Sequence, residues 1–173
     1  MMYVKKYREE AILVDQNDEI IGYKYRDELQ PTDRFRIVAI WLENHLGQAL
    51  IAQRSPQKKL HPELWGPAAA GGVEKGETYE ESAYKELAEE IGITDVALQP
   101  ITKELLCFQD DNVQRYCQWF FGQIETTDYD SFKLRQEEVA AVKWVDKPWV
   151  LRDVMDHPEI YTPSSASWPK LFG

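Results

Sequence analysis

A chain of 173 residues is long enough for one domain with a sizeable core, and its 43% hydrophobic and 12% aromatic content is typical of a globular protein. The net charge of −10 excludes the basic surface that non-specific nucleic-acid binding requires. No apolar run is long enough to span a membrane, and the charged N-terminus lacks a signal-peptide core. Cys107 and Cys117 predict two buried thiols in a reducing cytoplasm.

The first part of the chain predicts strands joined by turns. EAILVD and EIIGYKY flank the turn-type sequence QND, which predicts a β-hairpin over about residues 9–25. After the polar segment RDELQPTD, two further strands are predicted, RIVAIWLE and GQALIAQRS, around a turn at Asn44–Gly47. Prolines and glycines then make residues 55–72 rich in loops with short strands.

The second part of the chain mixes helices with strands. After a helix near residue 80, three strands are predicted, TKELLCFQ, YCQWFFGQIE and VAAVKWVD. Asp146 is placed to cap a helix from about Pro148 to Asp156, and the segment TPSSASWPKLFG is weakly patterned. Because helices and strands do not alternate strictly, we expect an α+β fold, an α/β/α sandwich with a mixed sheet between helices. With no linker in view, residues 1–173 are predicted to form one domain.

A helix rich in glutamate follows the loop region. Thr78 and Glu81 form a T-x-x-E capping box, so the helix should begin at Tyr79, and Gly92 should end it. An apolar stripe with a spacing of four residues faces the core, formed by Ala83, Leu87 and Ile91.

Three acidic residues share an adjacent face of this helix. Glu86, Glu89 and Glu90 are spaced i, i+3, i+4, where like charges repel by roughly a few tenths of a kcal/mol per pair. Several carboxylates on one face are what a hard divalent cation needs. The helix alone leaves two interpretations open, a metal site and a solvated acidic face.

The wider spacing resembles the Nudix box, G-x5-E-x7-R-E-U-x-E-E-x-G-U, where U is a bulky aliphatic residue. The resemblance covers residues 71–93, and the specified glycines and glutamates match at Gly71, Glu77, Glu86, Glu89, Glu90 and Gly92. The one departure is Lys85, where the family has an arginine that holds box glutamates in place. Lysine keeps the charge but loses the bidentate fork, so the cradle should form with less precision.

This resemblance implies a Nudix fold with a strand–loop–helix unit that binds Mg²⁺ or Mn²⁺. By position, Glu86 and Glu90 are the expected metal ligands, and Glu89 is a third ligand or activates water. Glu77 is expected to orient the loop and is a candidate ligand for a second metal, while Gly71 allows a tight turn and offers a carbonyl ligand.

The implied reaction is substitution at phosphorus in a nucleoside diphosphate linked to another group. A diphosphate is anionic and repels both hydroxide and an acidic protein. Divalent ions neutralise its oxygens, and a carboxylate can position or deprotonate the attacking water.

Over about residues 10–145 the chain is also similar to the Nudix branch that includes isopentenyl-diphosphate isomerase. That enzyme uses a cysteine and a glutamate, with a metal held by histidines and glutamates. The corresponding positions here lack those groups and hold Ala70, Gly72, Phe35, Val113 and Arg115. The similarity therefore implies a hydrolase, with isomerase activity as an unfavoured alternative.

Outside the box, Arg54 and Lys58 match positions that hold the diphosphate in the isomerase, although a solvated basic loop is equally compatible. Glu138, just before Val139, matches the late loop from which many Nudix enzymes bring a carboxylate to the metals or the water, although a solvated loop is equally compatible. His61 is a weaker candidate. Aromatic residues on one predicted strand offer surface for a base, with burial in the core as the favoured alternative: Tyr116, Trp119 and Phe121.

A second class of function is a Nudix module that binds nucleotides without turning them over. Such modules usually lose box glutamates, whereas Glu86, Glu89 and Glu90 are all present. We expect a small phosphorylated substrate of the nucleotide type and no nucleic-acid or membrane partner. The particular diphosphate, the number of metal ions and the identity of the general base stay open, and a homodimer is compatible with the sequence.

Overall fold

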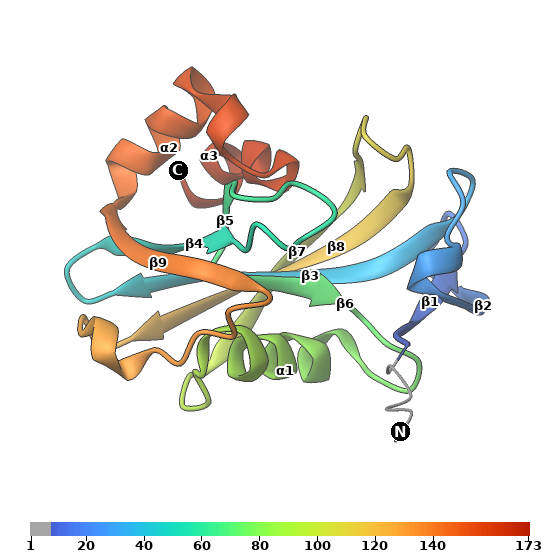
Figure 1. Ribbon diagram of the computed structural model, residues 1–173, viewed down its shortest axis with the longest axis horizontal. Helices are drawn as coiled ribbons and strands as arrows, with labels where there is room; N and C mark the ends of the chain where they lie inside the picture. The colour runs from blue at the N-terminus through green and yellow to red at the C-terminus, as the bar shows by residue number, and fades with distance from the viewer. Residues whose placement is uncertain (1–7) are drawn as a thin grey trace.

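The computed structural model describes residues 8–173 and shows a mixed sheet between two helical layers (Figure 1). Helix α1 (Tyr79–Ile91) covers one face of the sheet. Helices α2 (Lys147–Asp156) and α3 (Trp168–Phe172) cover the other. The predicted α+β sandwich is therefore confirmed.

The sheet has nine strands. They are β1 (Glu10–Val14), β2 (Ile20–Tyr25), β3 (Arg34–Asn44), β4 (Gln48–Arg54), β5 (Trp65–Gly66), β6 (Ala69–Gly72), β7 (Leu98–Cys107), β8 (Gln114–Ile124) and β9 (Val139–Asp146). Short 3₁₀ helices link them or follow them, η1 (Arg26–Glu28), η2 (Tyr129–Ser131), η3 (Pro158–Ile160) and η4 (Pro163–Ser167). The predicted hairpin and all five longer strands after it are present, and β7 begins four residues earlier than TKELLCFQ suggests.

Strand β3 organises the sheet. It pairs in parallel with β8 along its whole length, from Arg34 opposite Gln114 to Asn44 opposite Ile124. Its other edge pairs in turn with β1, β6 and β4, all antiparallel. Among the described strands, edge positions are held by β7, which pairs only with β8, by β2, which pairs only with β1, and by β9, which pairs only with β4.

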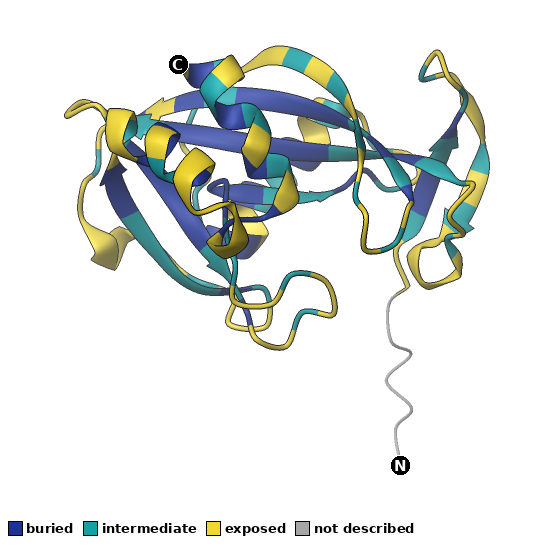
Figure 2. Ribbon diagram, turned by 90° about the horizontal axis from the view of Figure 1, so that it is seen from above, coloured by how far each residue is buried: buried dark blue, intermediate teal, exposed yellow. Residues whose placement is uncertain are grey.

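Alternation along β3 builds both halves of the core. Val38, Ile40 and Leu42 belong to the cluster under α1, whereas Ala39 and Trp41 belong to the cluster under α2 and α3. Successive side chains of a strand point to opposite faces, so one strand serves both layers. Figure 2 shows the central strands as buried and the outer turns of the helices as exposed.

Helix α1 begins and ends as its sequence predicts. The Thr78 hydroxyl accepts a bond from the Glu81 amide at 3.2 Å, and the Glu81 carboxylate accepts one from the Thr78 amide at 2.8 Å. Gly92 ends the helix in the left-handed conformation, with φ 74°. Asp146 likewise caps α2 through the Trp149 amide.

Two sequence predictions on side-chain burial meet different outcomes. Cys117 is buried and Cys107 is exposed, so the expectation of two buried thiols is wrong for Cys107, which lies at the end of edge strand β7; both are free thiols.

Within residues 8–173, no helix combines the length and apolarity needed to cross a membrane.

Candidate active site

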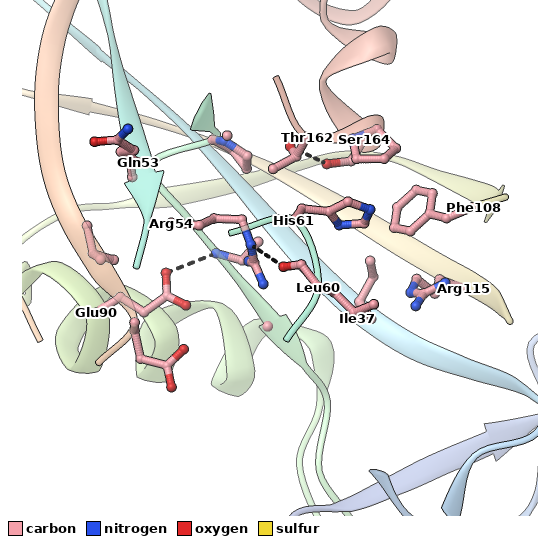
Figure 3. Close-up of a pocket in the computed structure, with 18 of the residues that line it drawn as sticks. Ile37, Gln53, Arg54, Leu60, His61, Glu90, Phe108, Arg115, Thr162 and Ser164 are labelled. Carbon is pink, nitrogen blue, oxygen red and sulfur yellow. Dashed lines mark hydrogen bonds between the residues drawn. The ribbon is translucent and has the colours of Figure 1, made fainter. Parts of the chain in front are cut away.

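A pocket opens beside the C-terminal end of α1 and encloses about 830 Å³ of space out to its mouth. Figure 3 shows Glu90 at one end, Arg54 and His61 in the middle, and Phe108 and Arg115 at the other end. Its walls come from the end of β4, from β6, from the loops after β4 and β7, and from the segment around Thr162. Segments far apart in the sequence therefore contribute to one cavity.

Glu90 projects into the acidic end of the pocket. It is only 9% exposed, and its Oε2 accepts a bond from the Ala70 amide at 3.3 Å. Burial, reinforced by the neighbouring Glu86 carboxylate, raises the pKa of Glu90 to about 8. A buried carboxyl group with such a raised pKa is typical of a functional site.

Glu86 lies one turn earlier on the same face. Burial raises its pKa to about 7, and the nearby Lys85 charge limits the shift. Its carboxylate occupies the space beside Gly71, where an added Cβ would overlap the carboxyl carbon and lie 2.5 Å from Oε2. Glycine is therefore required at position 71 to leave room for this carboxylate.

Glu77 and Lys85 brace the loop before the helix. The Lys85 ammonium donates to Glu77 Oε1 at 2.7 Å and to Glu74 Oε1 at 3.0 Å. Glu77 also accepts from the Ser82 hydroxyl at 2.5 Å and from the Glu74 amide at 3.2 Å. Burial alone would raise the pKa of Glu77, but these bonds outweigh it and lower the pKa. Lys85 thus makes the brace despite lacking the arginine fork, and Glu77 has its oxygens committed to the loop.

Glu89 lies apart from the other two box carboxylates. It is exposed and contacts Arg135 at 3.6 Å, a weak surface pair. In the described part of the chain, no three Asp, Glu, His or Cys side chains are already gathered around one metal position. Like charges at short range favour separation until a cation neutralises them. The role of Glu89 as a third ligand stays a prediction.

The donor set at this end fits a hard divalent cation. Glu86 and Glu90 offer carboxylate oxygens, the ligands that Mg²⁺ and Mn²⁺ prefer. Gly71 leaves the space that one of these carboxylates fills, and its carbonyl is a further candidate ligand. The Glu86 carboxylate raises the pKa of Glu90 through repulsion, and a bound cation would reverse that effect.

The two residues predicted to bind the substrate, Arg54 and Lys58, have different surroundings in the structure. Arg54 lines the pocket; its Nε donates to the Leu60 carbonyl at 3.0 Å, and within residues 8–173 its terminal amines have no hydrogen-bond partner. Burial lowers the pKa of Arg54. Lys58 instead forms an ion pair with Glu138, the predicted late-loop carboxylate, which lines the pocket next to Val139.

The aromatic residues of β8 offer no surface to the pocket, and burial in the core, the favoured alternative, holds for Trp119. Trp119 is fully buried, and it packs with Phe121 in the cluster under α2 and α3. Tyr116 lies on the opposite face and donates to the Gln16 carbonyl. None of the three lines the pocket, because the two layers of helices cover both faces of this strand.

Several pocket residues escaped the sequence analysis or received little weight. Arg26 reaches the pocket from η1, and Phe108 from the turn after β7. His61 also lines the wall; its Nε2 lies 2.5 Å from Asp110 Oδ2, although the angle does not allow a hydrogen bond. In the sequence, the only sign of these pocket residues was that basic and aromatic residues gather in predicted loops. No local pattern shows which loops meet at the pocket.

The positions that carry isomerase chemistry hold structural groups. Phe35 and Val113 are buried in the core, and the Ala70 amide binds Glu90. Arg115 pairs with Asp111, and an added Cβ on Gly72 would meet the Arg26 side chain. None of these five positions offers a thiol, an imidazole or a carboxylate.

The model of the NUDIX domain matches residues 33–162, which include the box, the pocket and most of the sheet. The chain belongs to the Nudix family. A Nudix hydrolase of Deinococcus radiodurans is 39% identical over 87 residues, covering 50% of this chain and 51% of that protein. The chain spans about half the length of that relative and of an uncharacterized Nudix hydrolase of Nostoc, of which 49% is covered.

Other Nudix proteins match over more of the chain. An isopentenyl-diphosphate Delta-isomerase of Salmonella typhi is 26% identical over 165 residues, covering 86% of this chain and 91% of that protein. The crystal structure of DR0079 from Deinococcus radiodurans superposes with a TM-score of 0.78 at 22% identity, covering 95% of this chain and all of that one. The NUDIX domain of Shewanella oneidensis NrtR, complexed with ADP ribose, gives a TM-score of 0.56 at 17% identity, with 72% and 83% covered.

Proposed function

We propose that this Nudix protein hydrolyses a diphosphate bond in a nucleoside diphosphate or a nucleoside-diphosphate-linked substrate, with Mg²⁺ or Mn²⁺ as the cofactor. The observation that carries the proposal is that the half-buried Glu86 and the buried Glu90 share one helix face, while Glu90 and the Arg54 guanidinium line the same pocket. Such an arrangement suits a substrate whose phosphates are held by a cation on one side and a guanidinium on the other.

Glu86 and Glu90 would hold the metal, with Glu89 and the Gly71 carbonyl as further candidate ligands. The bound metal supplies charge neutralisation at the phosphate oxygens and lowers the pKa of water. Glu77 and Lys85 act on the loop, because their contacts hold the segment that leads from β6 into α1.

In the proposed reaction, a water oxygen attacks phosphorus and the bond from phosphorus to the bridging oxygen breaks. The water proton passes to a carboxylate, and the bridging oxygen leaves with the second phosphate. Glu138 is a candidate acceptor because it lines the pocket within electrostatic reach of Glu90. Glu86 and Glu89 are the other candidates within the box. Arg54 would orient the phosphates through its two free terminal amines.

The nucleotide class is supported by likeness rather than by a stacking surface on β8. The NrtR domain, which shares the fold, is complexed with ADP ribose. The pocket offers the rings of Phe108 and His61 as aromatic walls.

The test is turnover of a broad panel of nucleoside diphosphates and their derivatives with Mn²⁺ at alkaline pH. In ¹⁸O-labelled water, the label must appear in a phosphate product. Glu86→Gln should lower the rate by orders of magnitude, since a general base alone is typically worth about 10²–10⁴-fold. Substrate binding should survive better, because Arg54 is retained. If the wild type leaves the whole panel intact, the nucleotide-binding module takes the place of the hydrolase.

A further inference from the structure

Two arginines approach one aromatic ring at the wall of the pocket. The guanidinium carbon of Arg115 lies 5.4 Å from the centre of the Phe35 ring, and that of Arg26 lies 5.8 Å from the same centre. Phe35 is 1% exposed, so it is a fixed platform. Both arginines line the pocket, although they come from distant segments, η1 after β2 and the start of β8.

Arg115 is held rigidly and still has unused donors. Its Nη1 donates to Asp111 Oδ1 at 3.0 Å and to the Val113 carbonyl at 2.7 Å, and its Nη2 donates to Asp111 Oδ2. Stacking against Phe108 at 4.5 Å fixes the plane of the group. A guanidinium has five N–H donors, so Nε and one Nη2 hydrogen have no partner among residues 8–173.

Arg26 carries the positive charge toward the middle of the pocket. Its Nη1 donates to Glu9 at 2.8 Å, and the side chain is 41% exposed. Its charge also acts on Glu86, whose pKa it lowers, and on Arg54, whose pKa it lowers as well. Arg26 therefore adds a positive charge to the pocket lining that acts on both Glu86 and Arg54.

Three guanidiniums in one pocket repel one another, in a protein whose net charge is −10. Asp111 and Glu9 compensate two of them only in part, because each arginine retains N–H donors that have no partner within residues 8–173. An oxyanion with several acceptors would satisfy these donors and remove the repulsion.

We propose that Arg26 and Arg115, on the Phe35 platform, form a second anion subsite that holds a phosphate group of the substrate without a metal. This inference rests on the proposed function, because it assigns the subsite to a phosphate other than those at Arg54 and the carboxylates. The substrate it fits carries a phosphate group beyond the diphosphate that is cleaved. The hairpin before residue 33, outside the matched NUDIX segment, thereby becomes part of the substrate site through Arg26.

The subsite is tested by titrating the metal-free protein with inorganic phosphate in EDTA, followed by ³¹P NMR. The wild type should bind phosphate, and Arg26→Gln should weaken binding about tenfold through loss of a charge-assisted hydrogen bond. Asp111→Asn should strengthen binding several-fold, because it frees Arg115 from its counter-charge. Arg115→Lys should weaken phosphate binding. It tests the role of Arg115 if Asp111→Asn does not fold.

Arg8→Gln is the matched control. Arg8 is an arginine of the same region with acidic partners, Asp27 and Glu28, and it stacks on Tyr25 outside the pocket. It should leave phosphate affinity unchanged.

Absence of phosphate binding in the wild type would overturn the proposal. Loss of binding only in Arg54→Gln, with Arg26→Gln unaffected, would overturn it equally. Glu86→Gln should keep metal-free phosphate binding while losing turnover. Failure of hydrolysis with phosphate binding intact would therefore count against the proposed function and not against the subsite.

Discussion

Gly71→Ala is the sharpest perturbation that the structure offers. The new Cβ would overlap the Glu86 carboxyl carbon and Oε1, and would meet no other group as closely. Moving the backbone would cost much free energy, whereas the end of a glutamate side chain can move to another rotamer at little cost. We therefore expect the Glu86 carboxylate to swing out of the cradle while the strand and helix keep their places.

The expected magnitudes differ for folding and for metal binding. Gly71 does not require a positive φ, so alanine is compatible with the backbone and gains roughly 0.4–1 kcal/mol from the unfolded state. Displacing Glu86 opposes this with a cost of similar size, because its rotamer and its contacts change. Stability should thus change little. Affinity for Mn²⁺ should fall by at least about 10–100-fold, the loss typical even of groups that only orient metal ligands.

The assay is calorimetric titration with Mn²⁺, beside thermal unfolding in EDTA. Gly22→Ala is the matched control, since an added Cβ there has nothing within 4 Å. In a double-mutant cycle, Gly71→Ala should lower the Mn²⁺ affinity little further once Glu86→Ala has removed the carboxylate. Wild-type Mn²⁺ affinity in Gly71→Ala would refute the view that this cradle positions a metal ligand.

Further outcomes follow from the same site. Glu90→Gln should weaken Mn²⁺ binding in calorimetry, and equal affinity would remove Glu90 from the ligand set. Without metal, the free energy of unfolding should fall by a few kcal/mol as pH rises from about 4.5 to 8. Folding raises the pKa of Glu86 to about 7 and of Glu90 to about 8, so the folded state binds more protons than the unfolded state in that window. Urea unfolding in EDTA at several pH values measures this, and a flat profile contradicts it. Lys85→Arg should fold and keep or modestly raise turnover, whereas a tenfold fall would show a pocket built around lysine. Isopentenyl diphosphate should gain no deuterium in a metal-dependent exchange assay, since Ala70 and Phe35 lack the required groups.

The sequence by itself determined the local elements of this protein. The capping box at Thr78, the stop at Gly92 and the cap at Asp146 depend on residues three or four positions apart, and each is present as predicted. The spacing of the box glutamates fixed which carboxylates share one helix face, because helical geometry alone sets that relation. Strand alternation in β3 and β8 likewise follows from period two.

Only the tertiary structure decided what those faces meet. The sequence favoured a core position for Trp119 but could not show which helical layer it packs against, because both layers are assembled from distant segments. Nor could it show that Lys58 pairs with Glu138, or that Glu89 lies exposed beside Arg135. Arg26 and Arg115 share the Phe35 ring because β1 and β8 flank opposite edges of β3, a contact between segments distant in the sequence that no local pattern encodes.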